Sequence, residues 1–120
     1  METQSFSADK RTDPSGKVII YSAHGQLNGK DVCFDWLELV RKDIQAGQSR
    51  VVINLGDVSR VDSTGIGIIA AVHVSSTNGG GKVCLTGLST SLWKLFESTW
   101  LLRVIPHAEA EAEAIRTAAS

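Results

Sequence analysis

Three consecutive polar residues, Asp62, Ser63 and Thr64, stand directly before the most apolar stretch of the sequence. Each can accept a hydrogen bond at the start of a helix, so redundant helix capping is one explanation of the pattern. Gly65 and Gly67 follow, although glycine is unfavourable inside a helix. Missing side chains there would leave the Ser63 hydroxyl accessible to a protein surface. A helix N-terminus also stabilises an anion, so this hydroxyl is well placed for phosphorylation.

Two enzymatic explanations of this stretch fail on spacing. Residues 65–70 match the G-x-G-x-x-A pattern of dinucleotide-binding loops, but the preceding strand is predicted to end near Leu55, ten residues too early. A serine nucleophile on a strand-to-helix elbow needs a glycine two residues before it, and Val61 stands there. We therefore expect a binding module rather than an enzyme, with no catalytic residue. A nucleotide-binding or small-ligand-binding domain stays as an alternative.

The composition excludes several classes of partner. The chain has 120 residues, with 12 basic and 13 acidic side chains, so it lacks the charge excess typical of nucleic-acid-binding domains and polybasic membrane anchors. No apolar run approaches the roughly 18 residues of a membrane span. Cys33 and Cys84 lie far apart without metal-ligand spacing, which predicts buried thiols and no metal site. We expect a cytoplasmic protein without a cofactor.

Hydrophobic periodicity and chain-breaking residues predict alternating strands and helices. Strands are expected at residues 17–24, 50–55, 82–86 and 102–105, with another short strand around residues 3–8. Helices are expected at residues 31–46, 64–77, 89–98 and 107–118. Residues 13–16 and 25–29 are interpreted as a turn and a loop. Asn28 or Asp31 is expected to cap the first helix and Gly47 to end it, while Gly56 and Asp57 are expected to end the second strand.

This alternation predicts a single α/β domain with parallel strands joined by helical crossovers. One face of the central strands is expected to be the more apolar, which indicates helices mainly on one side of the sheet. That face is assigned to Val18, Ile20, Val51, Ile53, Leu55, Val83 and Leu85, and the opposite face to Tyr21, Asn54 and Thr86.

Several segments resemble, in order, the STAS-domain proteins of the anti-sigma factor antagonist family. Residues 23–28 resemble its strand-end loop, residues 51–55 its central strand, and residues 62–67, Asp-Ser-Thr-Gly-Ile-Gly, its phosphorylation motif. Residues 80–83 and 92–97 resemble its later turn and helix. The resemblance covers about residues 17–115 and implies a superhelical β/α domain, which we expect to span residues 1–120 with its well-patterned core at about 17–118.

The resemblance also implies a switch. In the family, the unmodified antagonist binds an anti-sigma factor that is itself a serine kinase, and a sigma factor is thereby freed. The kinase phosphorylates the serine that aligns with Ser63, with Thr64 as the minor alternative here, and the complex parts. A PP2C-type phosphatase restores the antagonist. Two departures are Asn28, where the family commonly has Asp, and Trp100, where glycine is usual.

The expected partner surface combines the loop, the phosphorylation motif and one side of the following helix. Its candidate residues are Gly25, Leu27, Asn28, Asp62, Ser63, Thr64, Gly65, Ile66, Gly67, Ile68 and Val72. Whether Ile68 and Val72 face the partner, or instead Ile66, Ile69 and Ala70, stays open, as does burial of both sets, because this helix is apolar nearly all round. The chain is expected to be a monomer or weak dimer. An alternative of another class is a scaffold subunit of a stressosome-like or lipid-transport complex.

Overall fold

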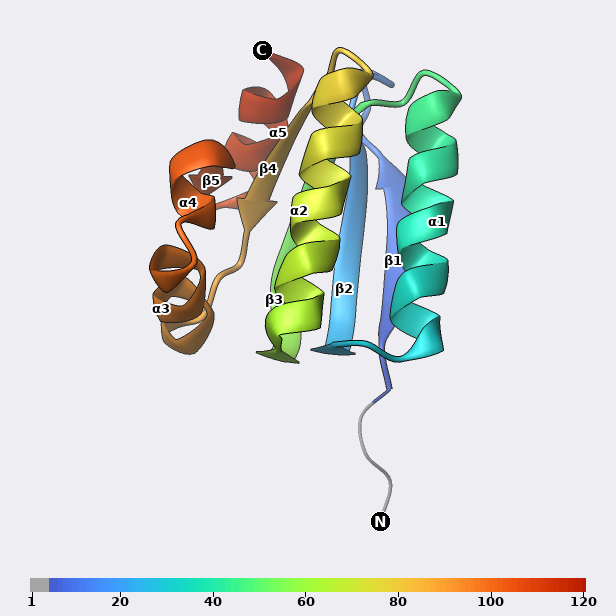
Figure 1. Cartoon of the computed structure of the whole chain (residues 1–120). Coiled ribbons are helices and arrows are strands. Elements are labelled where there is room, and N and C mark those ends of the chain that lie inside the picture. Colours follow the sequence, from blue (N-terminus) through green and yellow to red (C-terminus); the bar gives the residue numbers. More distant parts are fainter. Residues whose placement is uncertain (1–4) are drawn as a thin grey trace.

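The computed structural model describes residues 5–120, which form one five-stranded sheet in the order β1-β2-β3-β4-β5 (Figure 1). The edge strand β1 (Ser7–Thr12) is antiparallel to β2 (Ile19–Leu27). The next strands, β3 (Arg50–Val61), β4 (Lys82–Thr86) and β5 (His107–Ala108), continue the sheet in parallel. The helices are α1 (Asp31–Gln45), α2 (Ser63–Asn78), α3 (Thr90–Ser98), α4 (Leu101–Val104) and α5 (Glu111–Ala119). The predicted α/β class with a mixed, mostly parallel sheet is confirmed.

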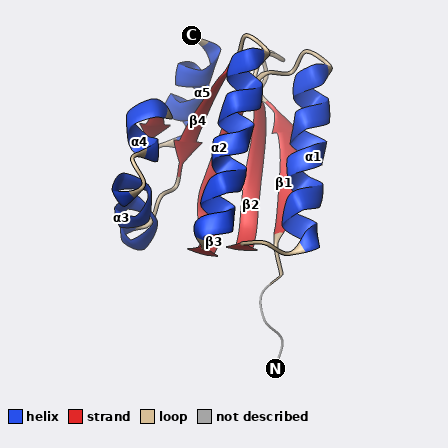
Figure 2. Ribbon diagram, in the orientation of Figure 1, coloured by secondary structure: helices blue, strands red, loops and turns tan. Residues whose placement is uncertain are grey.

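The helices divide unequally between the two faces of the sheet (Figure 2). The larger core lies under α1 and α2 and includes Tyr21 and Ile53, whereas a smaller cluster joins Val52 and Cys84 to the alanines of α5. Helices mainly on one face are therefore confirmed. The assignment of β2 to these faces was wrong, because Ile19 and Tyr21 pair with Val51 and Ile53 on the larger core. Val18 and Ile20 face α5 instead.

The second and third strands are longer than the sequence indicated. Gly25 does not end β2, because Gly25 and Leu27 continue the ladder opposite Val58 and Val61. The predicted end of β3 at Gly56 and Asp57 was wrong as well, since these residues fall at a register irregularity within a continuous strand. The longer strands place Leu27 and Val61 beside the start of α2. The loop, predicted at residues 25–29, is therefore shorter and lies at residues 28–30.

The segment after α3 was predicted least well. Residues 102–105 form no strand; the single turn α4 occupies Leu101–Val104, and Ile105 donates its N–H to the carbonyl of Leu101. The final helix begins at Glu111 rather than at residue 107, because His107 and Ala108 pair with Leu85 and Thr86 as β5. The N-terminal strand lies at Ser7–Thr12, later than residues 3–8; residues 3 and 4 fall outside the described part of the chain.

The remaining helices and β4 agree with the sequence to within one or two residues. Gly47 follows α1 with a φ of 101°, as expected of a helix-ending glycine. The start of α1 differs, because Lys30 is the N-cap and no side chain caps the helix. Cys33 and Cys84 are both buried, and burial raises the pKa of the Cys84 thiol. Over residues 5–120, no helix combines the length and apolar character needed to cross a bilayer.

Candidate functional site

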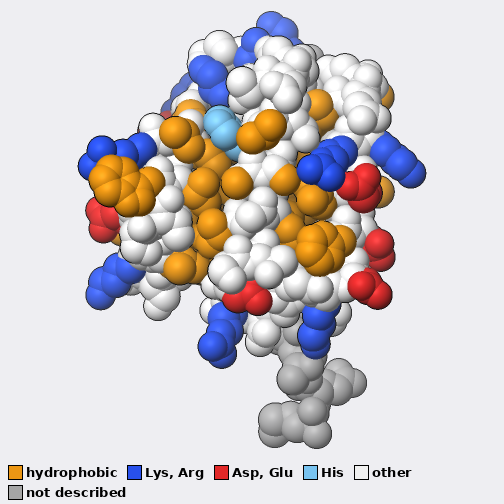
Figure 3. All heavy atoms as spheres, viewed as in Figure 1, with side chains coloured by type: hydrophobic (Ala, Val, Ile, Leu, Met, Phe, Trp, Pro, Cys, Tyr) orange, Lys and Arg blue, Asp and Glu red, His pale blue; other side chains and the backbone are white. Residues whose placement is uncertain are grey.

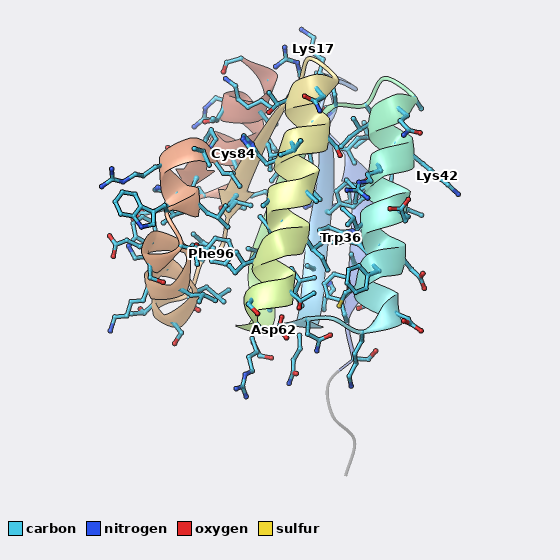
Figure 4. All side chains as sticks on the ribbon, viewed as in Figure 1. Lys17, Trp36, Lys42, Asp62, Cys84 and Phe96 are labelled. Carbon is cyan, nitrogen blue, oxygen red and sulfur yellow. The ribbon has the colours of Figure 1, made fainter. Side chains whose placement is uncertain are left out.

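Ser63 is the first residue of α2, at the end of the sheet where β2 and β3 finish (Figure 4, where Asp62 is labelled). The N-cap is Asp62, in an extended conformation, and its Oδ1 accepts a hydrogen bond of 2.9 Å from the Gly65 N–H. Only Asp62 among the three polar residues caps the helix in this way. Ser63 and Thr64 are exposed, so their hydroxyls stand at the helix terminus without serving as the cap.

The two glycines after Ser63 have different roles. A Cβ on Gly65 would lie 2.3 Å from the carbonyl oxygen of Leu27 and 2.8 Å from a methyl carbon of Val61. Gly65 is buried, and it allows the first turn of α2 to pack directly on the end of β2. Gly65 therefore serves helix packing, and not, as predicted, the access of a partner to the Ser63 hydroxyl. Gly67 fits that prediction, because it is exposed and a Cβ there would meet nothing within 4 Å.

Asn28 fixes the loop beside Ser63. Its Oδ1 accepts from the Lys30 N–H at 3.0 Å, and its own backbone N–H donates to Cys33 Sγ at 3.4 Å. A Cβ on Gly29 would lie 3.5 Å from the methyl carbon of Thr64, so this loop touches the first turn of α2. Asn28 was expected to cap α1, but it organises the residues before that helix instead. Gly29 and Lys30, both exposed, were not among the predicted site residues.

A shallow hollow of about 210 Å³ opens between the loop and the end of β3. It is lined by Gln26, Leu27, Asn28, Arg60 and Asp62. Arg60 is exposed, and within residues 5–120 neither Arg60 nor Lys30 forms an ion pair. Arg60 and Asp62 thus bring one cation and one carboxylate to the lining of the same hollow. Arg60 was missed by sequence reasoning, although its position three residues before Ser63 was visible.

Five predicted site residues do not reach this surface, and the buried Gly65 is one of them. Gly25 and Leu27 are buried inside β2, and the side chains of Ile68 and Val72 are only 2% and 0% exposed. Ile68 and Val72 belong to the main core together with Ile69, so they cannot present a face to a partner. Ile66 is half-buried against that core. We define the Ser63 surface as the exposed residues at this end of the molecule together with the half-buried Asn28, which organises the adjoining loop. Its members are Asn28, Gly29, Lys30, Arg60, Asp62, Ser63, Thr64 and Gly67.

The Ser63 hydroxyl lies at a helix N-terminus, where an added negative group is favoured. It is exposed on the first turn of a 16-residue helix, whose dipole accounts for this preference. The described residues contain no cluster of three or more His, Cys, Asp or Glu side chains able to hold a metal. The Asp62 cap and the close packing of Gly65 hold the first turn of α2, and with it Ser63, against the end of β2.

Comparisons with known proteins identify the family and the fold of the chain. A model of the STAS domain family matches residues 10–114. An anti-sigma-B factor antagonist from Listeria monocytogenes is 38% identical over 61 residues, which are 51% of this chain and 54% of that protein. The alignment therefore spans about half the length of this curated relative.

Solved structures share the fold across nearly the whole chain. An anti-sigma factor antagonist from Mycobacterium paratuberculosis superposes with a TM-score of 0.82 at 16% identity, covering 97% of this chain and 96% of that one. The phosphorylated form of SpoIIAA, a cell fate determinant of Bacillus, superposes with a TM-score of 0.71 at 18% identity, covering 92% and 98%. At these identities the superpositions establish the fold alone. The match of the family model over most of the chain shows that the protein belongs to the STAS domain family.

Proposed function

We propose that this protein is an anti-sigma factor antagonist regulated by phosphorylation of Ser63. The unmodified protein binds an anti-sigma factor that is a serine kinase, and the bound sigma factor is released. Phosphorylation of Ser63 separates the complex, and a PP2C-type phosphatase reverses it. The observation that carries the proposal is the exposed Ser63 hydroxyl on the first residue of α2, directly after the capping Asp62. The protein acts by binding and is not itself an enzyme.

The charges of the Ser63 surface explain why phosphorylation should weaken partner binding. A phosphate adds about 1.5 to 2 negative charges at neutral pH. In the free protein, water and the N-terminus of α2 stabilise that charge, so the fold tolerates it. In the complex, the phosphate would be enclosed beside Asp62, whose carboxylate is already committed to the Gly65 N–H. Enclosing two adjacent anions against a partner is unfavourable, and the bulk of the phosphate separates the surfaces.

The burial of Ile68 and Val72 moves the expected partner surface to the N-terminal end of α2. Gly67 is the informative position on this helix, because it is exposed and has open space around it. Gly67→Arg should leave the fold intact and block the kinase, since a long side chain would project into the contact. Thr77→Arg is the matched control, because Thr77 is exposed near the other end of the same helix. Equal kinase binding by both variants would place the contact elsewhere.

Phosphate mapping tests the proposed acceptor. Incubation with the cognate kinase and ATP should modify Ser63, with Thr64 as a minor site, as read by mass spectrometry of the digested protein. The Ser63→Ala variant should bind the kinase and resist inactivation. Thr90 provides a matched control, because it is likewise an exposed hydroxyl residue at the first position of a helix, α3, after the capping Ser89. Phosphate found on Thr90 or another residue, with Ser63 unmodified, would overturn the assignment.

A further inference from the structure

A second exposed surface lies on α3 and α4, among residues that the proposed function does not use. Trp93, Trp100 and Val104 are 39%, 61% and 59% exposed. Hydrophobic side chains gather over this part of the molecule beside Lys and Arg atoms (Figure 3). Tryptophan and arginine are the residues that most often dominate the energetics of protein contacts. We call the group Trp93, Glu97, Trp100, Arg103 and Val104 the α3–α4 patch.

The exposed Trp100 has a strained, left-handed backbone conformation. Its φ is 68°, and it is the single non-glycine residue between Ser5 and Ser120 with a positive φ. A bulky residue adopts this left-handed conformation at a cost, and the cost persists in a fold where the conformation is needed. The turn itself, with the Trp100 N–H on the Glu97 carbonyl, would form equally well with glycine. The fold thus explains the conformation but gives no reason for an exposed indole.

The patch also combines a protruding group with a hollow and with both signs of charge. A hollow of about 480 Å³ lies between Trp93, Trp100, Leu102 and His107, and the edge of the Trp93 ring packs on His107 with centroids 4.6 Å apart. The Arg103 guanidinium stacks over the Trp100 ring at 4.1 Å. Glu97 lines the same hollow. In the part of the chain that the structure describes, neither Arg103 nor Glu97 has an ion-pair partner.

We propose that the α3–α4 patch is a two-fold symmetric contact between two copies of this chain. In a two-fold contact, when residue i of the first copy binds residue j of the second, residue j of the first copy also binds residue i of the second. The same patch must therefore contain both partners of every interaction. The α3–α4 patch does this: Trp100 of one copy enters the hollow of the other, and Arg103 pairs with Glu97 of the partner subunit. A partner of a single charge sign would fit only half of these groups. The patch consists of a few side chains on two short helices, so we expect a small contact and a weak dimer.

Sedimentation equilibrium of the full chain, from about 1 to 500 µM, tests the contact directly. We expect a monomer–dimer equilibrium. Trp100→Gly should weaken dimerisation at least about a hundredfold while the melting temperature stays unchanged or rises, because glycine relieves the strained backbone. Trp100→Asn serves the same purpose if the glycine variant folds poorly, since Asn tolerates the left-handed conformation. Lys94→Glu is the control: Lys94 is exposed on α3 and does not line the hollow.

Exchanging the two charges distinguishes a specific Arg103–Glu97 pair between the copies from non-specific hydrophobic association. Arg103→Glu and Glu97→Arg should each weaken the dimer about tenfold or more, and the double variant should return to within about threefold of the native constant. A chain that sediments as a monomer throughout the range would overturn the proposal, as would dimerisation unaffected by Trp100→Gly. Failure of the double variant to recover would overturn the symmetric pairing. None of these variants alters the Ser63 surface, so phosphorylation and kinase binding are tested separately.

Discussion

The starts of α2 and α4 both expose a side chain at the surface, but their backbone conformations and capping differ. At α2 the N-cap Asp62 is extended, its carboxylate binds the Gly65 N–H, and a buried glycine seats the helix on β2. At α4 the N-cap position is Trp100, left-handed and without a side-chain cap. The first arrangement is relaxed and offers a small hydroxyl that can be modified. The second is strained and offers a large apolar side chain. A small group suits a reversible chemical change, and a large one suits contact area.

The largest expected effect separates the two glycines of the α2 start. Gly65→Ala should reduce the free energy of unfolding by about 3 kcal/mol, because its Cβ would overlap the Leu27 carbonyl and the Val61 side chain. Gly67→Ala should raise it by up to about 1 kcal/mol, since alanine favours the helix and the position is open. Urea unfolding followed by circular dichroism measures both. Similar values for the two variants would contradict the close packing of α2 on β2.

The next effect is the loss of a side-chain cap, which should be similar at the starts of α2 and α3. Asp62→Ala should cost about 1 kcal/mol, because the Gly65 N–H loses its acceptor, whereas Asp62→Asn should retain most of the stability. Ser89→Ala should behave like Asp62→Ala, since Ser89 Oγ accepts from the Leu92 N–H at the start of α3. The same urea titrations report these losses. An Asp62→Ala variant as stable as the native protein would remove the cap from the explanation of this site.

The smallest effect carries the opposite sign. Trp100→Gly should raise the free energy of unfolding by up to about 1 kcal/mol, because the relief of the left-handed strain exceeds the lost stacking of Arg103. The measurement is made at a low protein concentration, where the monomer dominates. A clear loss of stability would mean that the indole supports the fold, and the contrast between the two helix starts would disappear.

Local signals were sufficient for much of the fold. The ranges of α1, α2, α3 and β4 follow from periodicity and from breakers such as Gly47, all of which act within a few residues. The segment around residues 102–105 was predicted as a strand because its residues favour one, but a turn at Trp100 and burial of Ile105 override that preference. The extent of β2 and β3 depends on their pairing with each other, which no local pattern records.

The candidate site shows the same division. The positions of Asp62 and Ser63 at the helix start follow from capping chemistry, and the structure agrees. The partner-facing side of α2 could not be derived, because an almost wholly apolar helix has no stripe that distinguishes core from surface. Packing decides it: Ile68, Ile69 and Val72 are buried, while Gly67 and Val74 are exposed. Gly65 was recognised as unusual, but only its distance to Leu27 shows that it serves packing.

A phosphate on Ser63 is expected to abolish partner binding and to leave the fold unchanged. Calorimetric titration of the kinase with the unmodified and Ser63-phosphorylated proteins, alongside their melting temperatures, tests it most directly. We expect affinity to fall at least about a hundredfold, equivalent to roughly 2.7 kcal/mol, with little change in melting temperature. Ser63→Asp should weaken binding less, having one charge and less bulk, and Thr90→Asp should not weaken it. A phosphorylated protein that binds the kinase as tightly as the unmodified one would contradict the switch.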